Sequence, residues 1–265
     1  MNWYVPKNIS RKYIAGFTFR ELCDQNICPR YTQVFDPNLL SSDKFLFMNL
    51  DMFEPFVDFL KKNNIQNKFK LVTHNSDREF TKEMIDLVDP FVEKVYALNA
   101  TVTHPKVIKI PIGFNDQSTE IIDKFQFEET EKTKLVYVNF KLHHHPDRPI
   151  CLSYFESKDW ATKEKTLIPQ EDFYNVIKDF KYCICPRGTG IDTHRIYESL
   201  LFGVIPIVKN NELSDLYRKL PIILVDSWQE VDYDYLVSNY ESNLNKYRSW
   251  IEENRNWYLP EYWLR

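Results

Sequence analysis

Apolar and polar positions alternate along the first half of the chain in blocks whose lengths suit strands and helices. Short apolar runs predict strands at residues 45–49, 69–73, 94–98 and 107–110. Amphipathic stretches at 52–62 and 81–88 lie between these runs and predict helices. An alternation of this kind is typical of a parallel sheet covered by helices.

The alternation stops between residues 115 and 134, where the sequence becomes polar and acidic, and then it starts again. In the second half, strands are predicted at 135–140, 182–185, 204–208 and 222–225. Helices are predicted at 149–156, 171–179 and 193–202. From residue 232 to the end the pattern is helical and rich in tyrosine and tryptophan.

These blocks predict an α/β fold with two Rossmann-like domains. We expect an N-terminal domain at residues 1–115, a linker at 116–133 and a C-terminal domain at 134–265, whose terminal helix packs back across both domains. The length of 265 residues suits this division, since domains of roughly 100–150 residues are common. A hydrophobic content of 43% provides enough apolar side chains for two buried cores.

Charge and composition narrow the expected partners. A formal net charge of -4 creates no field that attracts nucleic acid, so no nucleic-acid partner is expected. No run approaches the roughly 18 apolar residues of a transmembrane helix, and the first residues do not have the order of a signal peptide. The five cysteines lack the paired spacings of a zinc site. We expect reduced thiols and a cytoplasmic location.

The segment 182–208 has the pattern of a strand, a glycine-containing loop, a helix and a second strand. In such a crossover unit, the loop lies at the carboxyl edge of the sheet, where ligands bind. Gly188 and Gly190 let backbone amides approach an anion closely. Asp192 is expected to be the N-cap of the helix, and Gly203 is expected to end it.

Charged residues around this loop predict a nucleotide site. The helix start at Thr193 offers unpaired N–H groups, while Arg187 and Arg195 can hold the oxygens of a diphosphate. Glu198 lies one turn beyond Arg195 on the same helical face and can accept hydrogen bonds from a ribose diol. Alternatively, Arg195 and Glu198 form only a surface ion pair, and the glycines serve only the turn. The combination in one short segment favours the nucleotide site.

Two other loops carry further candidates. Arg148 or Lys141 follows the strand at 135–140 and either adds a third positive contact or is a solvent-exposed cation. The histidine triplet that begins at His143 and ends at His145 invites a metal-site interpretation. However, adjacent residues rarely converge on one ion without acidic or thiolate partners. We therefore predict no metal site.

The strand at 69–73 leads into a loop with His74 and Asp77, at the carboxyl edge of the first sheet. In a protein with two Rossmann-like domains, this edge is expected to face a cleft. Ser76 or Asp77 can instead serve only as the N-cap of the helix near residue 81.

Four segments resemble the exostosin-like glycosyltransferases, particularly their short, unanchored members in large viruses and microbes. These segments are 185–198 (CPRGTGIDTHRIYE), 203–208 (GVIPIV), 71–77 (LVTHNSD) and 110–113 (IPIG). The resemblance implies a GT-B fold with a cleft between its domains and metal-independent transfer from a nucleoside-diphosphate sugar. It also implies that Arg195 and Glu198 contact phosphate and ribose, and it favours inversion and a uracil- or guanine-linked donor. The membrane anchor of animal exostosins is not evident, so a Golgi setting is not implied.

The sequence thus predicts a glycosyltransferase without a cofactor, whose partners are a nucleotide-sugar donor and a glycan or another hydroxyl-bearing acceptor. Asp77 or, failing it, His74 is expected to activate the acceptor hydroxyl, with Glu21 and Asp24 as competitors. The first alternative is a non-catalytic module that binds nucleotide sugars. The second is a metal hydrolase that uses the histidine triplet.

Overall fold

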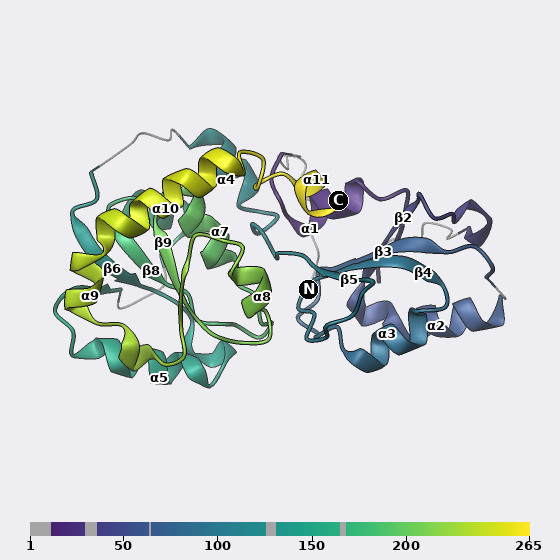
Figure 1. Cartoon of the computed structure of the whole chain (residues 1–265), viewed down its shortest axis with the longest axis horizontal. Coiled ribbons are helices and arrows are strands. Elements are labelled where there is room, and N and C mark those ends of the chain that lie inside the picture. Colours follow the sequence, from purple (N-terminus) through teal and green to yellow (C-terminus); the bar gives the residue numbers. More distant parts are fainter. Residues whose placement is uncertain (1–11, 30–35, 64, 126–130, 165–167) are drawn as a thin grey trace. The chain divides into compact units, whose positions relative to one another are not determined.

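The computed structural model describes residues 12–29, 36–63, 65–125, 131–164 and 168–265. The chain forms two compact units, each built on a five-stranded parallel sheet (Figure 1). The N-terminal unit comprises Lys12–Ile112, Gly190–Asp192 and Tyr258–Arg265, and the described C-terminal unit comprises Gly113–Thr189 and Thr193–Trp257. The predicted α/β fold with two Rossmann-like units is therefore confirmed.

The N-terminal sheet has the strand order β1-β2-β3-β4-β5, and all neighbours are parallel. Its strands are β1 (Gln25–Ile27), β2 (Phe45–Asn49), β3 (Phe69–His74), β4 (Val92–Ala97) and β5 (Val107–Lys109). Helices α2 (Phe53–Lys62) and α3 (Lys82–Val88) cover one face of this sheet (Figure 1). Apolar residues of α2 recur at helical spacing, and this stripe buries Phe53, Phe56, Val57 and Leu60 in the core.

Segments from both ends of the sequence complete the N-terminal unit. Helix α1 (Gly16–Glu21) places Phe19 beside the ring of His74, and helix α11 (Pro260–Trp263) belongs to the same unit. Ile14 N donates to Tyr258 O at 2.7 Å. Helix α10 (Tyr240–Glu253) belongs to the C-terminal unit, so the C-terminal region contributes to both units.

The C-terminal sheet has the order β10-β9-β8-β6-β7, again with parallel neighbours. Its strands are β6 (Lys134–Val138), β7 (Ala161–Lys163), β8 (Phe180–Ile184), β9 (Ile205–Lys209) and β10 (Ile223–Val225). Its remaining helices are α4 (Thr119–Lys124), α5 (Asp147–Glu156), α6 (Gln170–Ile177), α7 (His194–Leu201), α8 (Ser214–Tyr217) and α9 (Tyr233–Ser238). Short 3-10 helices lie at Pro37–Leu39, Leu50–Met52, Leu142–His144 and Trp228–Glu230.

Alternate residues of the central strands pack on the two faces of this sheet. Tyr182 and Ile184 of β8 lie in a core with residues of α5 and α9. Cys183 and Cys185 are both 0% exposed, and Cys185 Sγ lies 3.9 Å from Ser199 Oγ of α7. Both thiols are therefore packed in the core.

Helix α7 ends in the geometry predicted from its glycine. Gly203 has a φ of 65°, Gly203 N donates to Leu200 O at 3.2 Å, and Val204 N donates to Ser199 O at 2.9 Å. This pair of hydrogen bonds is the Schellman arrangement, which needs a left-handed residue after the helix. The predicted role of Gly203 is confirmed.

The region expected to be a linker, residues 116–133, differs from the prediction. Its described residues belong to the C-terminal unit and include α4, in which Thr119 and Ile122 are buried. Phe125 packs edge-on against Phe202 at a centroid distance of 4.9 Å. Among the described acidic residues, Asp123 and Glu131 are exposed and none is fully buried, so composition alone did not reveal the buried face. Elsewhere, the sequence pattern did not predict α1, β1, β7 or α8, which are six residues long or shorter.

Within the described residues, no helix is long and apolar enough to cross a membrane.

Replacing Gly203 with alanine tests the helix end. A β-carbon at this position meets nothing closer than Lys132 Cε at 3.7 Å, so the cost arises from the positive φ and not from a clash. We expect Gly203→Ala to lower the free energy of unfolding by about 1 kcal/mol in urea denaturation. Gly203→Asn is the control and should cost less, because asparagine tolerates the left-handed region better. Equal stability of wild type and Gly203→Ala would contradict this account.

Candidate functional site

The carboxyl edge of the C-terminal sheet carries the glycine-containing motif. Strand β8 ends at Ile184, the loop follows, and α7 begins at His194 before the chain enters β9. The predicted unit of strand, loop, helix and strand is confirmed. Because β8 and β9 are parallel neighbours, the loop is held at one edge of the sheet.

The start of α7 differs from the sequence prediction. Thr193 and not Asp192 is the N-cap, and the Thr193 side chain makes no capping hydrogen bond. Asp192 is 3% exposed, and its Oδ2 accepts a hydrogen bond from Ile112 N at 2.8 Å. Local spacing suggested a cap, but a backbone donor 80 residues away in sequence binds this carboxylate. The positive end of the α7 dipole at this turn favours an anion.

Arg195 lies in the first turn of α7 and is held in a defined orientation. Its guanidinium carbon lies 3.7 Å from the centroid of the Phe173 ring, and its Nε lies 3.5 Å from Glu198 Oε2. The side chain is 21% exposed. Its Nη1 is buried and has no hydrogen-bond partner within the part of the chain that the structure describes. A charged donor without an acceptor is costly, so the site is suited to an anionic ligand.

Glu198 is 3% exposed and is bound by side chains of the preceding helix. Its Oε1 accepts hydrogen bonds from Gln170 Nε2 at 2.6 Å and from Tyr174 Oη at 3.2 Å, both on α6. The predicted shared face of Arg195 and Glu198 is confirmed by their ion pair one turn apart. The carboxylate therefore fixes Arg195 whether or not it also binds a ligand hydroxyl.

Arg187 and Gly188 lie in the loop just before the point where the chain enters the N-terminal unit. The Arg187 side chain is 20% exposed, and its Nη1 lies 3.8 Å from Glu212 Oε2. This separation is long for an ion pair, and the glutamate side chain is half exposed. Such a pair contributes little to stability, so an anionic ligand can replace the glutamate at low cost.

Arg148 was expected to be either a third positive contact or a solvent-exposed cation, but its guanidinium is buried against backbone carbonyls. It is 7% exposed, and its guanidinium donates to Arg187 O at 2.7 Å, Lys141 O at 2.8 Å and Pro186 O at 3.3 Å. Burial and the nearby Arg195 lower the pKa of this guanidinium. Arg148 thus joins the loop after β6 to the glycine-containing loop and adds positive charge there. The Lys141 side chain itself is exposed.

The histidine triplet lies in and just after the 3-10 helix Leu142–His144. The rings of His143 and His144 are edge-on to each other, with centroids 4.5 Å apart, and His145 Nδ1 accepts from Asp147 N at 3.2 Å. Across the described ranges, no group of three histidine, cysteine, aspartate or glutamate side chains is arranged to hold a metal ion. Burial and the cationic Arg187 lower the pKa of His145.

In the N-terminal unit, the two candidate bases have contrasting surroundings. His74 is 2% exposed; its Nδ1 lies 2.8 Å from Asn75 N and 3.0 Å from Asn75 Oδ1, and its Nε2 lies 3.2 Å from Pro111 O. Asp77 is exposed, and its Oδ1 lies 3.3 Å from the point that a β-carbon on Gly190 would occupy. The geometry favours Asp77 over His74 as an acceptor of a proton.

The structure also shows which residue caps α3 and what the competing base Asp24 contacts. Thr81 is the N-cap of α3, so neither Ser76 nor Asp77 caps that helix. Asp24 accepts hydrogen bonds from Lys44 Nζ and Phe45 N, both at 2.9 Å, and thereby joins β1 to β2.

Sequence reasoning did not find three residues that shape the site. Phe173, Gln170 and Tyr174 all lie on α6 and contact Arg195 or Glu198. Their amphipathic pattern predicted a helix, but nothing in the linear spacing connected that helix to the motif.

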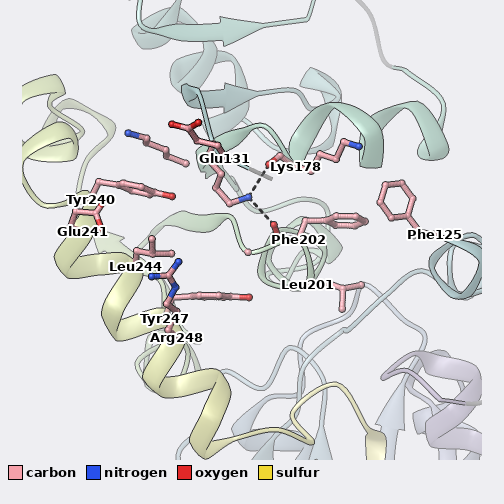
Figure 2. Close-up of a pocket in the computed structure, with 13 residues that line it drawn as sticks. Phe125, Glu131, Lys178, Leu201, Phe202, Tyr240, Glu241, Leu244, Tyr247 and Arg248 are labelled. Atoms are coloured by element: carbon pink, nitrogen blue, oxygen red, sulfur yellow. Dashed lines mark hydrogen bonds between the residues drawn. The ribbon is translucent and has the colours of Figure 1, made fainter. Parts of the chain in front are cut away.

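A separate pocket of about 660 Å³ lies on the C-terminal unit (Figure 2). Lys132 lines this pocket, and its Nζ donates to Lys178 O and Phe202 O, each at 2.9 Å. Lys132 precedes β6 and Lys178 precedes β8, so the pocket lies at the amino-terminal edge of the sheet. The motif lies at the carboxyl edge, and this pocket is therefore not the candidate site.

Comparisons with known proteins agree with the coarse prediction. No protein-family model matches the chain. Two curated proteins of Arabidopsis thaliana, each described as a probable glycosyltransferase, are 33% identical over 69 residues and 27% identical over 66 residues. The matches cover 26% and 24% of this chain, but only 13% and 14% of the relatives' own length.

A solved structure is also similar, namely that of an alpha,alpha-trehalose-phosphate synthase (UDP-forming) from Burkholderia vietnamiensis. The similarity covers 83% of this chain and 74% of that chain, with 9% sequence identity and a TM-score of 0.45. In about a quarter of its sequence, this chain is therefore similar to probable glycosyltransferases, while its resemblance to the exostosin-like group stays a prediction.

Proposed function

We propose that this protein transfers a glycosyl group from a nucleoside-diphosphate sugar to a hydroxyl of a glycan or another acceptor. The observation that carries the proposal is the arrangement of Arg195, stacked on Phe173 and paired with Glu198, with one buried guanidinium nitrogen lacking a partner among the described residues. The partial similarity to two probable glycosyltransferases supports it.

The donor diphosphate would bind at the start of α7. Arg195 and Arg187 can each donate to phosphate oxygens, and the positive end of the α7 dipole favours negative charge. Arg148 acts through the loop, because its hydrogen bonds to Arg187 O and Pro186 O hold the backbone near Gly188. These positive groups can stabilise a departing diphosphate without a divalent cation.

Glu198 is proposed to accept a hydrogen bond from the donor ribose through Oε2. Oε1 already accepts from Gln170 and Tyr174, whereas Oε2 lies at the longer distance of 3.5 Å from Arg195 Nε. A carboxylate oxygen has room for a second hydrogen bond. A uracil- or guanine-linked donor remains our proposal for the base.

In the transfer step, Asp77 is proposed to take the proton of the acceptor hydroxyl. The acceptor O–H bond breaks, the acceptor oxygen forms a bond to the anomeric carbon, and the bond from that carbon to the phosphate oxygen breaks. The electron pair of the broken bond leaves with the nucleoside diphosphate. Attack from the face opposite the leaving group inverts the anomeric configuration, and it needs a single base.

Arg195→Ala tests the donor site. Loss of one charged hydrogen-bonding group should weaken nucleoside-diphosphate binding by about 1.5–3 kcal/mol in titration calorimetry. Arg218→Ala, which removes an exposed arginine of the same unit, is the control and should bind normally. Glu198→Gln separates two roles of this carboxylate. If Glu198 contacts the ribose, binding of the nucleoside diphosphate should weaken while binding of pyrophosphate changes little. If Glu198 only holds Arg195, the affinities for both ligands should fall equally. Unchanged affinity in both Arg195→Ala and Glu198→Gln would contradict the site.

Removal of divalent cations tests the proposed electrostatics. Because arginine side chains and the α7 N-terminus replace the cation, turnover of nucleotide sugars should survive excess EDTA with little change in kcat. A discontinuous assay of released nucleoside diphosphate measures this directly. Complete loss of turnover, with rescue by manganese, would show that the charge is neutralised by a metal.

Asp77→Asn tests the base. The substitution keeps the size of the side chain but removes its ability to accept a proton, so kcat should fall by about 100-fold or more while donor affinity stays nearly unchanged. The acidic limb of the pH–rate profile should also disappear from the residual activity. Asp58→Asn, on the exposed surface of α2, is the matched control. Normal turnover by Asp77→Asn would remove this residue from the mechanism, and binding without turnover in wild type would indicate a non-catalytic module.

A further inference from the structure

The middle of the glycine-containing motif is buried in the N-terminal unit. The segment Gly190–Asp192 belongs to that unit, although Thr189 and Thr193 on either side belong to the C-terminal unit. Ile191 is 0% exposed and Asp192 is 3% exposed. The chain therefore leaves the C-terminal unit for three residues, between Arg187 and Arg195, and then returns to begin α7.

Asn99 is the side chain that holds this segment. It follows β4, it is 1% exposed, and its Oδ1 accepts a hydrogen bond from Asp192 N at 3.0 Å. The Asp192 carboxylate in turn accepts from Ile112 N at 2.8 Å. Asn99 has a φ of 52°, a conformation that costs free energy in most residues and that asparagine tolerates. A strained, buried residue therefore makes a long-range contact to the motif.

Gly190 lies between Asn99 and Asp77. A β-carbon on Gly190 would lie 2.8 Å from Asn99 Nδ2 and 3.3 Å from Asp77 Oδ1. The first distance is too short for any real contact, so only glycine fits without a shift of its neighbours. Asn99 Nδ2 is buried and has no hydrogen-bond partner in the described ranges. The amide nitrogen and the Asp77 carboxylate thus approach the same point beside the motif.

We propose that Asn99 is a positioning residue for glycosyl transfer: by holding Asp192 and packing on Gly190, it keeps the segment Gly190–Asp192 and Asp77 in one fixed arrangement within the N-terminal unit. The inference rests on the proposed function, in which Asp77 is the base. Arg195 and Glu198 make their described contacts within the C-terminal unit. Loss of the Asn99 contact should therefore impair the transfer step more than donor binding.

Kinetics of three variants at Asn99 test the proposal. Asn99→Ala removes the acceptor for Asp192 N, and a small misplacement of reacting groups is expected to lower kcat by about tenfold to 100-fold, with the donor dissociation constant within about twofold of wild type. Asn99→Gly removes the same acceptor, but glycine adopts the positive φ without strain. It should therefore lower kcat as much as Asn99→Ala does if the lost contact, and not backbone strain, causes the defect. Calorimetric binding stoichiometry near one shows that each variant is folded.

Asn99→Asp provides the conservative rescue. Aspartate keeps an oxygen for Asp192 N and tolerates the left-handed conformation, so kcat should recover at high pH. Its added negative charge disfavours the ionised form of Asp77, which raises the pKa of that carboxyl. The acidic limb of the pH–rate profile should therefore move to higher pH. An unmoved limb would contradict the proximity of Asn99 to the base.

Gly190→Ala and Gly203→Ala form a matched pair at two glycines. The first places a methyl group against Asn99 and Asp77 and should lower kcat, while the second strains the end of α7 and should leave kcat unchanged. Normal kcat in both Asn99→Ala and Gly190→Ala, with wild-type turnover present, would overturn the role of Asn99 alone. Nucleotide binding by wild type without turnover of any nucleotide sugar would overturn the proposed function and this role with it.

Hydrogen exchange distinguishes these failures without any assay of activity. The peptide that spans residues 186–198 should exchange faster in Asn99→Ala than in wild type, because the Asp192 amide loses its acceptor. Unchanged protection of this peptide would contradict the proposed contact itself, whatever the enzyme turns over.

Discussion

Parallel pairing of every neighbouring strand is the constraint on which the rest of this structure depends. Parallel neighbours cannot be joined by a tight hairpin, so each connection crosses back to the start of the next strand through a helix or a long loop. The loops that leave the strands then gather at one edge of each sheet. This is why the glycine-containing motif after β8 and the polar loop after β3 both lie at carboxyl edges, although residues 74 and 185 are far apart in sequence.

Three arginines in one unit would repel one another if nothing offset their charge. Each of the three guanidinium groups has different partners. Arg148 is surrounded by three backbone carbonyls, Arg195 lies on an aromatic ring beside a carboxylate, and Arg187 keeps a distant, exposed glutamate. Positive charge is thus gathered near the start of α7, and the orientation of Arg195 is set before any ligand arrives.

The sequence predicted the parts of this fold that depend on neighbours along the chain. Strand β3, helix α2 and the helix end at Gly203 all follow from local spacing, from amphipathic pattern or from the backbone freedom of glycine. Asp192 shows the limit, because its spacing suggested a helix cap and its actual donor is the amide of Ile112. The α6 partners of Arg195 and Glu198 show the same limit. Helix α6 was predicted, but which side chains of another element it meets depends on tertiary packing.

The path of the chain also has a consequence for modular exchange. The N-terminal unit is assembled from three separate stretches, which end at Ile112, Asp192 and Arg265, and hydrogen bonds such as Ile14 N to Tyr258 O and Asp192 N to Asn99 Oδ1 join them. A contiguous fragment cut at residue 112 would keep all five strands of the sheet but would lose both of these ties. Recombination at a single junction therefore cannot exchange one half of the protein intact, and a functional chimera would have to carry Gly190–Asp192 and Tyr258–Arg265 from the same parent as the N-terminal sheet.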